Sequence, residues 1–179
     1  MLRHGKVDCA SGLCYGASDV SVSAALTRAI AKRVAPDLPA NVEVFASPLS
    51  RCSQLAVALE ALRPDLQTQF DTRIAEMDFG AWEGRLWDEI GRDEFDAWIR
   101  EFATGRAGGS GESTNSFMSR VGDAYDAWRA ARRDALWVTH AGVIRAVWLL
   151  HGGMRALERA DQWPRRQLGF GELVEIEAV

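Results

Sequence analysis

The sequence predicts an α/β fold built as a three-layer α/β/α sandwich, with a mostly parallel central sheet. Short apolar runs rich in β-branched residues alternate along the chain with longer stretches whose apolar residues recur at helical spacing. Strands that alternate with helices place helices on both faces of a parallel sheet. The length of 179 residues suits one domain with a sizeable core, so we expect residues 1–179 to form a single unit.

Three segments have the pattern of strands. Asn41–Ser47 and Ala135–His140 are short apolar runs bounded by polar residues, which is typical of buried strands. Glu172–Val179 alternates between apolar and polar residues, which predicts a strand with one wetter face.

Four segments have helical patterns. Ser21–Ala35 and Ser50–Leu62 are rich in alanine, and the second stops before Pro64. Ser116–Arg132 carries its apolar residues on one side, whereas Val143–Leu150 is apolar nearly all round and is predicted to be a buried helix.

The remaining long stretch is predicted to be a helical insertion at about residues 84–112. Leu86–Phe102 supplies its helical part, and the small-residue stretch Gly105–Ser113 is the surface loop that closes it.

Composition excludes several classes of function. The net charge of −4 gives no global basic field for nucleic acid or anionic lipid. The three cysteines are too few, and odd in number, for a disulfide framework, which indicates a reducing cytosol. The N-terminus lacks an apolar signal region, and no apolar run reaches the length of about 18 residues that a membrane span needs. We therefore expect a cytoplasmic protein with no nucleic-acid or membrane partner.

Arginine and histidine residues occur in the sequence near three expected strand ends. Arg51 follows the strand Asn41–Ser47 at the start of a helix, His140 stands at the same kind of junction, and Arg3 and His4 precede a loop near the start of the chain. Ligands of parallel sheets bind beyond the carboxyl ends of the strands. We therefore expect these four side chains to meet at one edge of the sheet.

Such a cluster has the chemistry of an anion site. Helix starts offer unpaired N–H groups, and arginine matches phosphate oxygens two at a time. The sequence has neither a carboxylate cluster for a metal nor a G-x-x-x-x-G-K-[ST] phosphate loop. The sequence thus predicts that protein groups alone hold the anion, with no cofactor and no metal.

A histidine in this site is also a candidate nucleophile. Neutral imidazole is available near pH 7, and neighbouring arginines lower the pKa of a histidine further. Attack on phosphorus gives a phosphohistidine and divides one difficult displacement into two. The leaving oxygen then needs a proton, for which Glu76, Asp78 and Glu83 are candidates in a loop that contains Trp82.

Five motifs in order resemble the histidine phosphatase superfamily. They are "LRHG", "SPLSRCSQLA", "EMDFGAWEG", "GES" and "VTHAGVIRA", and together they cover essentially the whole chain. The resemblance is to the branch that contains cofactor-dependent phosphoglycerate mutases and small-molecule phosphatases, and it implies a phosphoglycerate mutase-like fold. "GLCYGASDV" and "EMDFGAWEG" are most similar to the alpha-ribazole phosphatases of cobalamin assembly and their bacterial relatives.

The resemblance also implies residue roles. His4 is the phosphorylated nucleophile, His140 completes the pocket, and Glu76 protonates the leaving group. Phosphate is held by Arg3, Arg51 and the backbone at Gly142. The resemblance also places Glu112 near the rim of the pocket. Three more residues are candidates for the substrate pocket from their positions: Leu13 and Tyr15 follow the first motif, and Trp82 lies in the loop of Glu76.

The sequence departs from the family pattern at its start. Members usually carry a strand of several residues before the first motif, at the centre of the sheet, whereas only Met1 and Leu2 precede Arg3 here. We therefore expect a truncated first strand.

Three functions stay open at this point. The leading one is a metal-independent phosphomonoesterase acting through phosphohistidine on a small-molecule phosphate ester, with alpha-ribazole 5′-phosphate as a candidate. The short chain favours this hydrolase over the second, a phosphoglycerate mutase or sugar bisphosphate phosphatase. The third is an inactive module that binds phosphorylated ligands. The sequence does not decide whether the protein is a homodimer.

Overall fold

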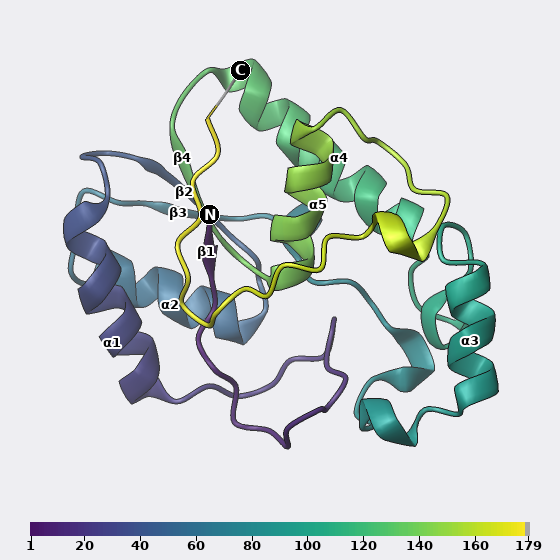
Figure 1. Cartoon of the computed structure of the whole chain (residues 1–179). Helices are drawn as coiled ribbons and strands as arrows, with labels where there is room; N and C mark the ends of the chain where they lie inside the picture. Colours follow the sequence, from purple (N-terminus) through teal and green to yellow (C-terminus); the bar gives the residue numbers. More distant parts are fainter. Residues whose placement is uncertain (178–179) are drawn as a thin grey trace.

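A computed structural model describes residues 1–177 and contains a four-stranded parallel sheet (Figure 1). The strands are β1 (Leu2–Arg3), β2 (Glu43–Ala46), β3 (Thr68–Phe70) and β4 (Ala135–Thr139), in the order β1-β4-β2-β3. All three strand pairings are parallel, so every carboxyl end lies at the same edge. The predicted α/β class and parallel sheet are confirmed.

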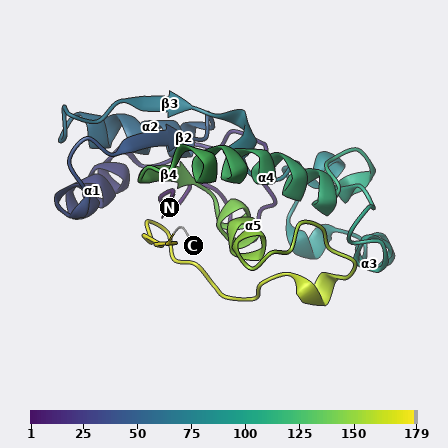
Figure 2. The same ribbon diagram turned by 90° about the horizontal axis from the view of Figure 1, so that it is seen from above.

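The first strand is short, as expected, but it does not lie at the centre of the four-stranded sheet. Leu2 and Arg3 pair with Val138 and Thr139 of β4, and β1 ends the strand order. The segment after α5 (Ala141–His151) returns to its other side, where Leu173 forms an isolated antiparallel bridge with Leu2 (Figure 2).

The prediction of a strand over Glu172–Val179 is wrong for the described residues. Within 172–177 the pairing is limited to the Leu173 bridge, because β1 offers only two residues as a partner. Residues 178 and 179 lie outside the described part of the chain.

Two helices cover one face of the sheet. They are α1 (Ala24–Val34), capped by the Ser23 side chain, and α2 (Ser50–Glu60). Alternate strand residues point toward them, including Val44 and Val138, and pack with these helices in one buried cluster.

Two further helices cover the opposite face (Figure 1). They are α4 (Thr114–Ala131) and α5. Phe45 and Trp137, the neighbours in sequence of the residues on the first face, pack with α4 and α5 in a second cluster. The alternation along β2 and β4 thus produces the three predicted layers.

The insertion contains one α-helix, α3 (Arg92–Arg100), which is shorter than the predicted stretch Leu86–Phe102. Its aromatic residues surround Trp82, whose ring centroid is 5.4 Å from that of Trp98 and 6.1 Å from that of Phe95. Within residues 1–177 no helix is both long and apolar enough to cross a membrane.

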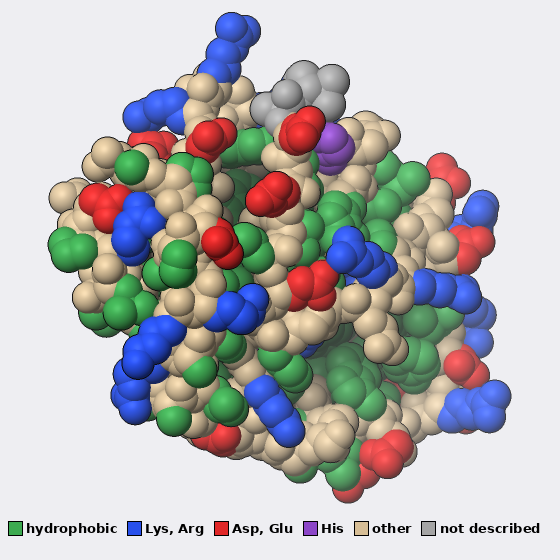
Figure 3. Space-filling view, turned by 60° about the vertical axis from the view of Figure 1, so that its left-hand side comes forward, with side chains coloured by type: hydrophobic (Ala, Val, Ile, Leu, Met, Phe, Trp, Pro, Cys, Tyr) green, Lys and Arg blue, Asp and Glu red, His purple; other side chains and the backbone are tan. Residues whose placement is uncertain are grey.

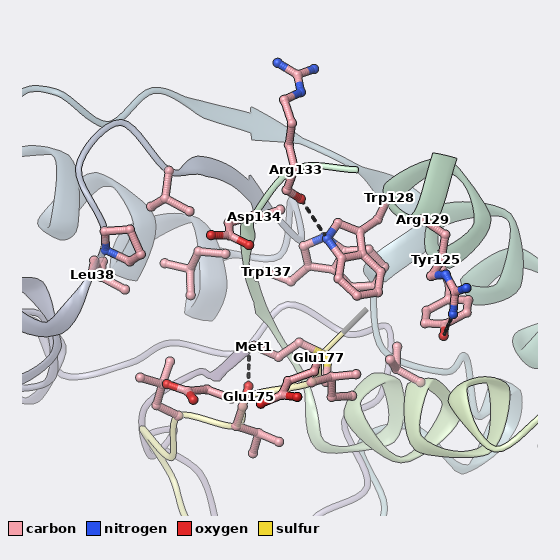
Figure 4. A pocket seen from close by; sticks show the side chains of 18 of the residues that line it. Met1, Leu38, Tyr125, Trp128, Arg129, Arg133, Asp134, Trp137, Glu175 and Glu177 are labelled. Carbon is pink, nitrogen blue, oxygen red and sulfur yellow. Dashed lines mark hydrogen bonds between the residues drawn. The ribbon is translucent and has the colours of Figure 1, made fainter. Parts of the chain in front are cut away.

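A hollow in the described structure lies at the amino ends of the strands, away from the predicted site. Its volume is about 1090 Å³, and Met1, Trp128, Trp137 and Glu175 lie around it (Figure 4). None of the predicted site residues lines this hollow. Acidic and basic side chains are interspersed on the face shown in Figure 3, so no single charge dominates that face.

Candidate active site

The carboxyl edge of the sheet brings His4 and His140 together from opposite ends of the chain. The backbone amide of His4 donates to the carbonyl of Thr139, the last residue of β4, at 3.0 Å. The two imidazole rings have centroids 5.1 Å apart and are inclined by 60°. Pairing of β1 with β4 therefore sets the distance between the two histidines.

Hydrogen bonding fixes the tautomer of His4. Its Nδ1–H donates to the carbonyl of Gly5 at 2.7 Å, which leaves the lone pair on Nε2. The side chain is 2% exposed. Burial, followed by the charges of Arg51 and Arg3, lowers the pKa of His4 to about 3. His4 is thus neutral at physiological pH, as a nucleophile requires.

His140 is neutral for related reasons but has the opposite tautomer. Nε of Arg51 donates to its Nδ1 at 3.2 Å, so its proton is on Nε2 and is donated to Oγ of Ser47 at 2.8 Å. Complete burial, and then the Arg51 charge, keep the pKa of His140 well below its ordinary value.

Arg51 lies between the histidines and the loop that follows the first motif. Its terminal nitrogens donate to the carbonyls of Gly16, at 2.5 Å, and Ser18, at 2.8 Å. Its guanidinium carbon lies 5.2 Å from the centre of the Tyr15 ring. This buried arginine therefore holds the loop in place and brings the Tyr15 ring beside its own guanidinium.

Arg3 presents an unpaired donor at the same edge. One terminal nitrogen donates to the carbonyl of Leu168, and the guanidinium carbon lies 4.0 Å from the centre of the Phe170 ring. Its Nε is buried and has no hydrogen-bond partner among the described residues. The Phe170 ring also contacts His4, with centroids 5.8 Å apart, so the segment after α5 covers this side of the site.

Glu76 reaches the site from the loop after β3. Its carboxylate accepts hydrogen bonds from the backbone amides of Gly142 and Met77, both at 3.1 Å. A Cβ at position 142 would collide with this carboxylate, which explains the glycine. The Gly142 amide, predicted to contact phosphate, thus contacts the predicted proton donor in this structure.

This convergence agrees with a family comparison. The model of the histidine phosphatase superfamily, branch 1, matches residues 1–172.

The chain belongs to the histidine phosphatase superfamily.

Solved structures of relatives support the membership. The complex of mycobacterial glucosyl-3-phosphoglycerate phosphatase with VO3 is 26% identical and superposes with a TM-score of 0.77, covering 95% of this chain and 86% of that one. Phosphoglycerate mutase from Thermus thermophilus is 28% identical, with a TM-score of 0.67 and 97% of both chains covered. A search of curated proteins found no significant match. The chemistry of this superfamily member is therefore that of phosphate esters, with the substrate undetermined.

Asp78 and Glu83, the two other candidates for the proton donor, have different partners in this superfamily member. Glu83 accepts from the backbone amides of Ala17, Ser18 and Phe79, and from the Ser18 hydroxyl. Asp78 accepts from the Gly80 amide at 2.7 Å. Both carboxylates therefore organise loops.

Two predicted pocket residues contact the insertion. Trp82 is only 1% exposed, because the aromatic side chains of the insertion enclose it, and its role at a substrate pocket stays a prediction. Leu13 is half-buried and bridges to Leu86 at the insertion.

Glu112 forms an ion pair with Arg120, a residue that sequence reasoning missed. Their closest atoms are 2.7 Å apart, and both side chains are about a quarter exposed. Arg120 lies in the middle of an amphipathic helix, and its spacing does not distinguish it from a surface arginine.

Within residues 1–177, no cluster of three or more His, Cys, Asp or Glu side chains has the arrangement of a metal site. The arrangement at the sheet edge supplies an imidazole lone pair, the buried guanidinium of Arg51, the half-buried guanidinium of Arg3 and one carboxylate. These are the groups that a phosphoryl transfer through histidine uses.

Proposed function

We propose that this protein is a metal-independent phosphomonoesterase that acts through a phosphohistidine on His4. The observation that carries the proposal is the neutral His4 ring, with its Nε2 lone pair, beside His140 and two arginines. A binding module has no need for a nucleophile held in this state.

In the first step, the Nε2 lone pair of His4 attacks phosphorus, and the bond from phosphorus to the ester oxygen breaks. The departing oxygen takes a proton from Glu76. Arg3, through its unpaired Nε, and Arg51 stabilise the charge on the transferring phosphoryl group.

In the second step, water attacks the phosphoryl group on His4. The Glu76 carboxylate takes a proton from that water, the bond from nitrogen to phosphorus breaks, and its electron pair returns to Nε2. Inorganic phosphate leaves, and both residues regain their initial states.

A mutase is the second candidate. The short chain does not exclude it, because the Thermus protein named phosphoglycerate mutase matches over 97% of both chains.

The substrate is an open part of the proposal. Alpha-ribazole 5′-phosphate is suggested by the motifs around residues 12–20 and 76–84. Glucosyl-3-phosphoglycerate is a second candidate, because the similar mycobacterial phosphatase is named after this ester.

The test is turnover of p-nitrophenyl phosphate in the presence of EDTA, followed by product analysis with alpha-ribazole 5′-phosphate, glucosyl-3-phosphoglycerate and 3-phosphoglycerate. Release of inorganic phosphate supports the hydrolase. Conversion of 3-phosphoglycerate to 2-phosphoglycerate supports the mutase. A requirement for added metal, or binding without turnover, contradicts the proposal.

A further inference from the structure

The Arg120 guanidinium donates its hydrogen bonds to the loop that carries Glu76 and to the Glu112 carboxylate. Nη1 donates to the carbonyls of Arg73 and Ala75, at 2.9 and 2.8 Å, and Nη2 donates to the carbonyl of Glu76 itself at 3.0 Å. Nε and Nη2 also donate to the Glu112 carboxylate, at 2.7 and 2.8 Å. These five bonds use the five N–H groups of an arginine, so none is left for substrate.

Glu112 joins the same loop from the other side. Its carboxylate accepts from the Asp78 amide at 3.0 Å, and its own backbone amide donates to the Asp78 carbonyl at 2.8 Å. The ion pair is therefore hydrogen-bonded to the loop on both sides of Glu76, at Ala75 and Asp78, and at Glu76 itself.

The loop that carries Glu76 also packs closely against the end of the insertion through backbone atoms. Gly80 and Gly108 have positive φ, at 57° and 55°, and a Cβ at either position would collide with the backbone of the opposite segment. A Cβ at Gly111 would also collide with backbone atoms, those of Asp78 and Gly80. The loop that carries Glu76 and the end of the insertion thus meet backbone to backbone, with no space for adjustment by side chains.

We propose that Arg120 and Glu112 are positioning residues: they hold the backbone of Glu76 where its carboxyl group can transfer a proton to the leaving oxygen. The inference rests on the proposed function, because it assigns a task to the acid of that reaction. Arg120 fixes the backbone of Glu76, while the Gly142 amide orients its carboxylate.

The role has a kinetic signature that loss of stability does not produce. Proton donation matters most when the leaving group is a poor one, and general acid catalysis contributes about 10²–10⁴-fold. A displaced Glu76 should therefore slow the cleavage of phenyl phosphate far more than that of p-nitrophenyl phosphate, whose leaving group is a more acidic phenol. The two substrates are nearly equal in size, so binding contributes little to the comparison.

The experiment compares kcat/KM for these two esters in Arg120→Gln and in the wild type. We expect the ratio of p-nitrophenyl to phenyl phosphate cleavage to rise by about tenfold or more. In a Glu76→Gln background the same substitution should change the cleavage of phenyl phosphate by less than about threefold, since the proton donor is already gone. An unchanged ratio, or full additivity with Glu76→Gln, overturns the inference.

Arg155→Gln is the matched control. Arg155 pairs with Asp126 of α4, the helix that also carries Arg120, at 2.7 Å, but more than half of each side chain is exposed, and the bonds of Arg155 go to Asp126. This variant should keep the wild-type ratio. Glu112→Gln has nearly the shape of the original residue and gives the same comparison if circular dichroism shows that Arg120→Gln does not fold.

Failure of the inference is distinct from failure of the proposed function. A wild type that cleaves neither ester contradicts the proposed hydrolase. A wild type that cleaves both, with variants that keep its leaving-group ratio, contradicts only the positioning role.

Discussion

His4 and His140 lie edge to face, with ring centroids 5.1 Å apart, although 135 residues separate them in the sequence. Two hydrogen-bonded arrangements fix their tautomers: His4 gives its Nδ1 proton to Gly5, and His140 accepts from Arg51. Because both rings are buried beside arginine, both are neutral. The Nε2 lone pair of His4 is thereby left for reaction with a substrate, whereas His140 holds Arg51 in place through its Nδ1.

Acid should destabilise this fold. Burial lowers the pKa of His4 from 6.5 to about 3, so between these values the unfolded chain binds a proton that the folded chain does not. The stabilisation is complete above pH 6.5 and is lost as the pH falls toward 3, at about 1.4 kcal/mol per pH unit. Urea unfolding at pH 7.5, 6.5, 5.5 and 4.5 measures this slope.

The matched pair for that measurement is His4→Asn and His151→Asn. His151 is half-buried and bonds to the Tyr125 hydroxyl at 3.1 Å. His4→Asn should reduce the dependence of the free energy of unfolding on pH, and His151→Asn should leave that dependence unchanged. An equal slope in the wild type and His4→Asn would contradict the burial argument.

Glu76→Gln should act mainly on catalysis, and Glu83→Gln should act mainly on stability. Glu76→Gln should lower kcat for phenyl phosphate by about 10²–10⁴-fold. Glu83→Gln should instead reduce the free energy of unfolding by about 1–3 kcal/mol, because the Glu83 carboxylate holds the amides of Ala17, Ser18 and Phe79. Kinetics and urea unfolding of the two variants check this, and a catalytic loss confined to Glu83→Gln would reverse the assignment.

Gly142→Ala should impair catalysis. The new methyl group would occupy the position of the Glu76 carboxylate and displace it. We expect kcat for phenyl phosphate to fall by about 10²-fold. The control is Gly122→Ala in α4, where the nearest atom to a new Cβ is 3.5 Å away and the helix should gain about 0.5–1 kcal/mol of stability. Wild-type kcat in Gly142→Ala would show that the close approach is not required.

Much of the site was predictable, because its residues stand where strands end. His140 directly follows β4 and Arg51 lies in the first turn of the helix after β2, and parallel strands bring their carboxyl ends to one edge. The short β1 seats His4 despite its length, since its backbone bonds to β4 and to the segment at Glu172.

The parts that were missed carry little local signal. β3 consists of Thr68–Phe70, which is too short and polar for an apolar pattern. Arg120 is defined by carbonyls of a distant loop, and the burial of Trp82 by the aromatic residues of the insertion. The strand predicted over Glu172–Val179 failed because strand pairing depends on a partner, and β1 supplies only two residues.

The most direct test of the account is to quench the protein during turnover of a ³²P-labelled phosphate ester and to locate the label. We predict phosphate on His4 that is stable in alkali and labile in acid, absent from His4→Asn and trapped for longer in Glu76→Gln. Label on another residue, or steady turnover with no label on His4, would contradict the account.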